Sequence, residues 1–136
     1  MSQDISPYCI YTIRHTEILD KCFKDGGNGE FTEDTKWVTG RKLFLDAERD
    51  EMKMPVIFAA ADVGGGLLYY AWLKDVKVSD EDSTTTYKFT ELKRITNKPP
   101  KSSLKLMNTN RPLSNDFIRP YALCYTPSFI KGQKKE

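Results

Sequence analysis

Leu67–Val78, LLYYAWLKDVKV, is the longest β-strand that the sequence predicts. Apolar side chains occupy its even positions, with Lys74 as the exception. The odd positions begin apolar but end in Asp75 and Lys77. Successive side chains of a strand point to opposite faces. The pattern therefore predicts a strand with one face on a core, running out into solvent at its far end.

Other predicted elements surround this strand. Thr84–Phe89 alternates in the same way after an acidic turn and predicts a further strand. Apolar or β-branched runs predict strands at residues 8–13, 56–61, 104–107 and 121–125. Apolar stripes predict two helices, at residues 16–25 and 41–52, with Thr16 as the N-cap of the first. Residues 90–95 are expected to form one helical turn. Residues 26–34 are expected to form a loop.

This order of elements predicts the class of fold. A strand, a helix, a loop and a second helix precede four or five mostly antiparallel strands joined by short turns. Such an order favours an α+β fold with a curled sheet or a small barrel; we expect a small, mostly antiparallel β-barrel with two or three short helices packed across it. A chain of 136 residues with 39% hydrophobic content fits one globular domain, which we place at residues 1–130, with a frayed tail at 131–136.

The apolar runs and the cysteines bear on location. No apolar run approaches the roughly 20 residues that a membrane-spanning helix needs, so we expect no membrane partner. Cys9, Cys22 and Cys124 are odd in number, widely spaced and set among apolar residues. Reduced, buried thiols are typical of such a pattern, which favours a cytoplasmic protein. The sequence does not predict an oligomeric state.

Charge is divided unevenly along the chain. Residues 1–87 hold ten Lys and Arg against sixteen Asp and Glu, whereas residues 88–136 hold eleven against three. No acidic residue occurs between Leu92 and Asn115, where six cations stand: Lys93, Arg94, Lys98, Lys101, Lys105 and Arg111. A one-sided potential of this kind attracts polyanions. We expect these side chains to contact phosphates of RNA or DNA; the alternative is a solvated surface.

Aromatic side chains could supply the walls of a base-binding pocket. Every nucleic-acid base offers a flat face that stacks on aromatic rings. Trp37 lies in a predicted loop near Arg41, and Tyr70 and Trp72 lie on the apolar face of the long strand. A base pocket requires that Trp37, Arg41 and Tyr70 converge on one cleft. The alternative for both tryptophans is burial in the core.

Catalytic and metal signatures are weak. His15 is the single histidine, and the sequence has no Gly-x-Ser-x-Gly turn for a nucleophile. One histidine and three dispersed cysteines do not predict a zinc site. We therefore expect no metal, and the sequence favours a binding module over an enzyme.

Four segments resemble a known family. Tyr11-Thr-Ile-Arg14 followed by Glu17-Ile-Leu19 looks like a first strand that ends in a basic residue, then a short helix. Trp37-Val-Thr-Gly-Arg41-Lys-Leu-Phe44 looks like a tryptophan loop that leads into a second helix. Residues 54–60 and 70–78 look like two central barrel strands. This order is similar to the EVE branch of the PUA-like superfamily, whose relatives include the YTH and ASCH domains.

The resemblance implies a function and leaves alternatives open. It implies a barrel that binds RNA or DNA, often through a modified or flipped-out base, without a cofactor. Some ASCH-type relatives are amidohydrolases of modified nucleosides that use Lys, Thr and Glu. Lys42, Thr39 and Glu17 are the residues of those types here. A third alternative is a protein-interaction or self-association domain that pairs the acidic half with the basic half.

Overall fold

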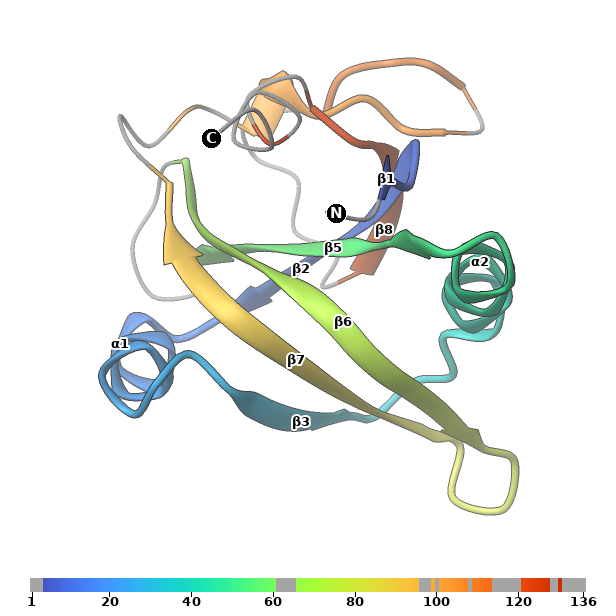
Figure 1. Ribbon diagram of the computed structural model, residues 1–136, viewed down its shortest axis with the longest axis horizontal. Helices are drawn as coiled ribbons and strands as arrows, with labels where there is room; N and C mark the ends of the chain where they lie inside the picture. Colours follow the sequence, from blue (N-terminus) through green and yellow to red (C-terminus); the bar gives the residue numbers. More distant parts are fainter. Residues whose placement is uncertain are drawn as a thin grey trace.

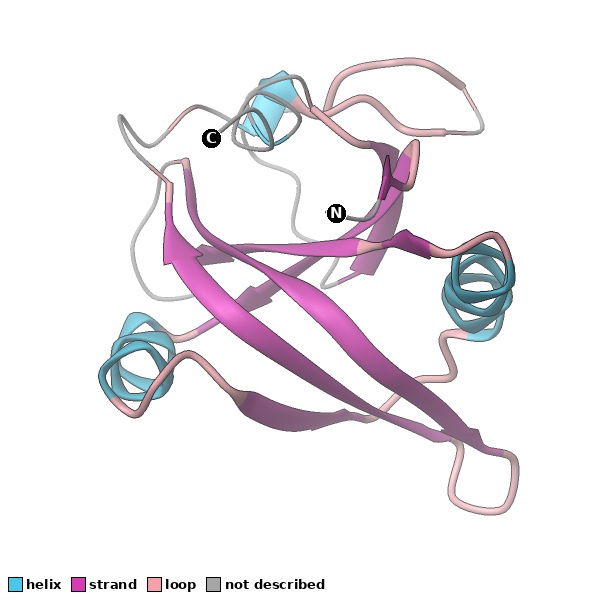
Figure 2. Cartoon of the chain, viewed as in Figure 1, coloured by secondary structure: helices cyan, strands magenta, loops and turns pink. Residues whose placement is uncertain are grey.

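The structure is a computed structural model that describes residues 4–60, 66–95, 99, 101–107, 109–113, 121–127 and 130. Strands and helices alternate in the first half of the chain, and strands dominate the second half (Figures 1 and 2). The elements are β1 (Asp4–Ile5), β2 (Tyr8–Arg14), α1 (Thr16–Lys24), β3 (Gly29–Glu33), α2 (Val38–Arg49), β4 (Met52–Lys53), β5 (Pro55–Ala60), β6 (Leu67–Ser79), β7 (Thr84–Arg94), the 3-10 turn η1 (Lys101–Ser103) and β8 (Tyr121–Tyr125).

One large sheet organises the molecule. Its strand order is β3-β7-β6-β5-β2-β8, and every neighbouring pair is antiparallel except β2 and β5, which are parallel. A parallel pair needs a long crossover, which here runs through α1, β3, α2 and β4. The small strands β1 and β4 form a separate parallel pair. The predicted α+β class, with a mostly antiparallel sheet and two helices, is confirmed.

The sheet is curled, with α1 and α2 at opposite sides of the molecule (Figure 1). Arg14 at the end of β2 forms an ion pair with Glu33 of β3, although β7, β6 and β5 lie between these strands in the sheet. The Arg14 guanidinium also lies 4.3 Å from the centre of the Phe31 ring of β3. Backbone pairing among the described residues nevertheless does not close the sheet into the barrel that we expected.

Two hydrophobic cores lie on the two faces of the sheet. The helix-side core contains buried residues of both helices and the inner sheet face: Ile10, Leu19, Trp37, Phe44, Ala47, Met54, Val56, Phe58, Tyr69, Ala71, Leu73, Val76, Tyr87, Phe89 and Leu92. The C-terminal core contains the other face and the segments that cover it: Cys9, Tyr11, Ile57, Ala59, Leu67, Tyr70, Trp72, Ile95, Leu104, Leu113, Ala122, Cys124 and Ile130. Strands β2, β5 and β6 are therefore buried on both faces.

Several elements differ from their predictions. Strand β6 does not keep one apolar face, because bulges between Tyr70 and Trp72 and between Leu73 and Asp75 shift its register against β7. Trp72 therefore belongs to the C-terminal core, whereas Val76 belongs to the helix-side core. The helical turn predicted at residues 90–95 is wrong, since β7 continues to Arg94 in pairing with β6.

Three further differences concern the helices and the loop between them. Strand β3 forms where a loop was expected, because Phe31 enters the aromatic packing around Phe58 and Phe89. Helix α2 begins and ends earlier than predicted, and the last residue of the predicted helix, Met52, belongs to β4. His15 rather than Thr16 is the N-cap of α1, without a side-chain capping bond. Neither described helix has the length and apolar character needed to cross a lipid bilayer.

Candidate nucleic-acid interface

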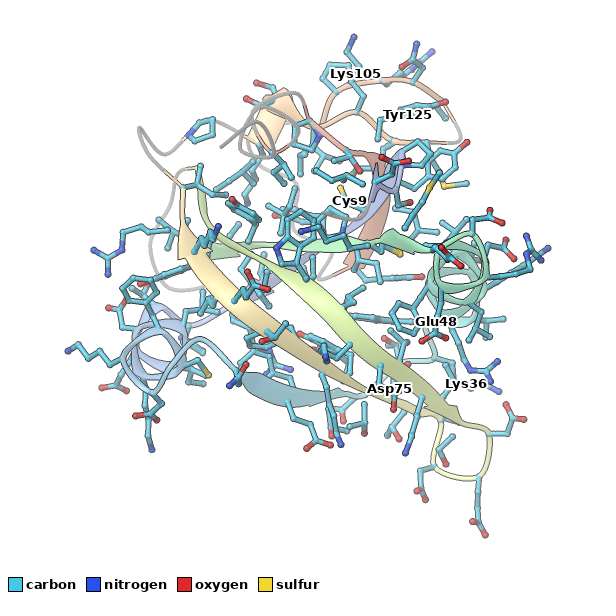
Figure 3. All side chains as sticks on the ribbon, viewed as in Figure 1. Cys9, Lys36, Glu48, Asp75, Lys105 and Tyr125 are labelled. Carbon is cyan, nitrogen blue, oxygen red and sulfur yellow. The ribbon has the colours of Figure 1, made fainter. Side chains whose placement is uncertain are left out.

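The predicted phosphate-binding cations lie on consecutive segments after β6. Lys93 and Arg94 end β7, Lys101 begins η1, and Lys105 and Arg111 follow on the next segment. Lys98 lies outside the described residues. The 3-10 turn η1 and the segment with Lys105 lie at the top of Figure 1, where Figure 3 labels Lys105, whereas β7 ends at the left of the molecule. We call the described cations Lys93, Arg94, Lys101, Lys105 and Arg111 the basic rim. All except the half-buried Lys101 are exposed.

Backbone hydrogen bonds fix the part of the rim that carries Lys105 and Arg111. Residues 104–107 and 109–113 fold back on each other through a bridge between Lys105 and Pro112. The Leu106 N–H donates to the Arg111 carbonyl at 2.8 Å. This basic hairpin is attached to β8, because the Tyr125 N–H donates to the Lys105 carbonyl at 2.9 Å. The strand predicted at residues 104–107 is thus reduced to two isolated bridges, at Lys105 and Leu106.

Trp37 does not offer a free ring face to a base. Its indole is stacked between Tyr87 at 4.7 Å and Tyr121 at 4.6 Å, measured between ring centroids. Only 1% of the residue is exposed. Its backbone N–H donates to the Thr85 hydroxyl at 2.7 Å, which fixes the start of α2. In this structure Trp37 therefore packs the helix-side core.

Tyr70 and Trp72 lie on the other face of the sheet from Trp37. Their rings meet edge to face at 5.9 Å in the C-terminal core, and both residues are buried. Burial raises the pKa of the Tyr70 hydroxyl, and the nearby Glu91 adds to the shift. Arg41 is exposed on α2. Trp37, Arg41 and Tyr70 therefore do not converge on one cleft.

The three residues of the hydrolase alternative are also apart. Thr39 and Lys42 are exposed on α2, whereas Glu17 is exposed on α1. The two helices lie at opposite sides of the molecule (Figure 1). A lysine nucleophile, a threonine and a carboxylate must act within hydrogen-bond reach of one substrate. The structure does not bring these three side chains together.

Sequence reasoning missed a small cavity beside Arg94. The cavity has a volume of about 160 Å³, and its lining includes Thr16, Asp20 and Tyr69. The Tyr69 hydroxyl donates to Asp20 at 2.5 Å and accepts from Arg94 at 2.8 Å. Burial raises the pKa of the Tyr69 hydroxyl, and its hydrogen bond to Asp20 adds to this shift. The cavity thus offers both donors and acceptors.

No local signal in the sequence marks this cavity. Asp20 lies in the middle of α1, Tyr69 near the start of β6 and Arg94 at the end of β7. These elements meet through the sheet pairing of Tyr69 with Arg94, the packing of α1 against β7 and the ring contact of Phe23 with Tyr69. Among the described residues, no three His, Cys, Asp or Glu side chains gather as a metal site would require.

Comparison of the chain with protein-family models and with curated protein sequences finds no match. Its function must therefore be argued from the geometry of its surface. Two described features carry chemistry of use to a ligand: the basic rim and the cavity between Asp20, Tyr69 and Arg94. Arg94 belongs to both, because it ends β7 in the rim and also lines the cavity, where it lies 3.6 Å from Asp20.

Proposed function

We propose that the protein binds RNA or DNA, with the basic rim on the phosphate backbone. The observation that carries this proposal is the clustering of exposed cations on segments that lack acidic residues from Leu92 to Leu113. Lysine and arginine side chains contact phosphates without reading sequence and release bound counterions as they do so. Lys98, though outside the described residues, belongs to the same acid-free run and is proposed to contribute.

The order of elements supports a PUA-like, EVE-type domain as the scaffold. Strand β2 ends in Arg14 and leads into α1, and the segment with Trp37 leads into α2, as in the family pattern. The curled sheet held by the contact of Arg14 with Glu33 is compatible with a barrel-like arrangement. Membership of that family remains part of the proposal.

The cavity beside Arg94 is the proposed place for an extruded base. Base edges carry donors and acceptors at fixed positions. Asp20 supplies an acceptor there, and Arg94 supplies donors next to the phosphate-binding rim. Trp37 takes no direct part in this scheme, because Tyr87 and Tyr121 cover both of its faces. The hydrolase alternative gains no support, since Glu17 is far from Thr39 and Lys42.

The test is binding of fluorescein-labelled RNA and DNA oligonucleotides, followed by anisotropy at several salt concentrations. We expect affinity to fall with added salt, and each lost phosphate contact to lower the log–log slope by about 0.7–0.9. Charge reversal of Lys101, Lys105 and Arg111 to Glu should abolish binding. Reversal of Lys42, Lys74 and Lys88, which are exposed outside the rim, is the matched control and should cost much less. Equal affinities of the two triple variants would contradict the proposal.

A further inference from the structure

A row of side chains crosses the edge of the sheet beside the basic hairpin. Tyr8 of β2 pairs with Tyr125 of β8. The antiparallel bridge between Leu106 and Cys124 places Lys105 opposite Tyr125, and Lys105 is bridged to Pro112 in turn. Residues directly opposite each other in neighbouring strands share a face of the sheet. The row therefore runs Tyr8, Tyr125, Lys105, Pro112.

The face of β8 that carries Tyr125 is accessible to solvent, whereas the opposite face is not. Tyr125 is 38% exposed, whereas its neighbour Cys124, on the opposite face, is completely buried. Lys105 is also exposed, and Figure 3 shows its side chain beside that of Tyr125. Most aromatic side chains of the described residues serve the two cores, as Trp37 and Trp72 do. Tyr125 is the described aromatic that is both exposed and directly opposite a cation of the basic rim.

The Tyr125 ring is held in place. Its hydroxyl donates to the Met107 carbonyl of the basic hairpin at 3.3 Å. Its ring centroid lies 5.6 Å from that of Tyr8, with the two planes tilted by 41°. A ring ordered before binding loses little conformational entropy when a ligand packs on it. The position therefore suits a flat ligand that also carries negative charge near Lys105.

We infer that the row around Tyr125 is a stacking site for an unpaired base, and that the preferred ligand is single-stranded nucleic acid. A base stacks on Tyr125 while Lys105 contacts a neighbouring phosphate. In a duplex the base faces are covered by the adjacent base pairs, so a duplex gains only the phosphate contacts. This inference rests on the proposed function and adds to it a preference for single-stranded over double-stranded nucleic acid.

The experiment compares two oligonucleotides of equal length and charge: a normal single strand and one with abasic sites in its centre. Both carry the same phosphates, so their affinity ratio reports the bases alone. Stacking on one ring strengthens binding by about 5- to 150-fold. We expect wild-type protein to show such a ratio and to bind the single strand more tightly than the duplex. Tyr125→Phe, which keeps the ring, should retain the ratio; Tyr125→Leu should lower it about 5- to 150-fold, leaving only what a base in the cavity beside Arg94 contributes.

The outcomes separate this inference from the proposed function. A ratio of one in the wild-type protein, with salt-dependent binding intact, overturns the stacking site and leaves phosphate binding standing. A normal ratio that is unchanged in folded Tyr125→Leu also overturns it. Absence of binding to every oligonucleotide overturns both. The comparison within the wild-type protein needs no variant, so a folding defect of Tyr125→Leu does not prevent a decision.

Discussion

Arg14 and Glu33 form an ion pair across the interior of the curled sheet, between strands that are not neighbours in it. The same Glu33 carboxylate accepts a hydrogen bond from the Tyr87 hydroxyl at 3.3 Å. Both charged side chains are largely shielded, with 21% and 15% of their surface exposed. The pair therefore joins β2 to β3 where no backbone hydrogen bond of the described residues does so.

Loss of this pair should loosen the sheet. We expect Glu33→Gln, which keeps the shape but removes the charge, to lower the free energy of unfolding by about 1–3 kcal/mol, because Arg14 is left shielded without its counter-ion. Urea unfolding followed by circular dichroism measures the change. Asp80→Asn is the control, since the exposed pair of Asp80 with Lys36 should contribute less than about 1 kcal/mol. Equal effects of the two changes would contradict this role for Arg14.

Stability should fall in alkaline solution. Burial raises the pKa of Cys124 and of Tyr11, each to about 12, from ordinary values of 9.0 and 10.0. The folded protein therefore holds protons that the unfolded chain releases above pH 9 to 10. The free energy of unfolding should decrease from there towards pH 12, by at most about 1.4 kcal/mol per pH unit for each group.

Urea unfolding at intervals from pH 8 to pH 11 measures this slope. Cys124→Ala removes one of the titrating groups, so its unfolding free energy should depend less steeply on pH between 9 and 11, whatever its absolute stability. If the unfolding free energy of the wild type does not change between pH 8 and pH 11, Cys124 and Tyr11 are not shielded as the structure places them.

Trp37 should matter for stability and not for nucleic-acid binding. Trp37→Phe leaves part of the space between Tyr87 and Tyr121 unfilled, and we expect a loss of about 1–3 kcal/mol in unfolding free energy. Oligonucleotide affinity of the folded variant should match that of the wild type in the anisotropy assay. Weaker binding at unchanged stability would instead make Trp37 a ligand-contacting residue, as its place in the sequence had suggested.

Gly40 should be required for the docking of α2 on the sheet. A Cβ atom there would lie 2.8 Å from the Tyr121 hydroxyl and 3.2 Å from Cδ1 of Ile10. The Gly40 N–H also donates to that hydroxyl at 2.9 Å. We expect Gly40→Ala to reduce the melting temperature, through a cost of about 1–3 kcal/mol. Thr39→Ala, an exposed change one residue earlier on the same helix, should leave it nearly unchanged.

The fold was predictable where local pattern and tertiary structure agree. The apolar run at Pro55–Ala60 and the alternation at the start of β7 became strands of the sheet. Strand β3 was not predictable, because Gly29–Glu33 has one apolar side chain, Phe31, and gains its structure from pairing with β7. The bulges of β6 carry no sequence signal, so the apolar residues could not be divided between two cores in advance.

Of the candidate site, only the positively charged residues could be predicted from the sequence. A run without acidic residues identifies the basic rim, since Lys and Arg at positions such as Lys105 and Arg111 remain exposed in most folds. Aromatic residues are different, because sequence does not tell which ring is covered. Trp37 seemed available and is enclosed, whereas Tyr125 had only been assigned to a strand and is exposed. The cavity could not be predicted either, because its residues Asp20, Tyr69 and Arg94 lie on three different elements.

The β6–β7 hairpin ends in Asp80, Glu81 and Asp82, at the opposite side of the molecule from Lys105 in Figures 1 and 3. This separation gives the molecule a permanent electric dipole. In the field of a nucleic acid, such a dipole experiences a torque that turns the basic rim forward and the hairpin tip away. Under the proposed function, the protein would therefore approach a nucleic acid with the basic rim foremost and the acidic tip turned away from it.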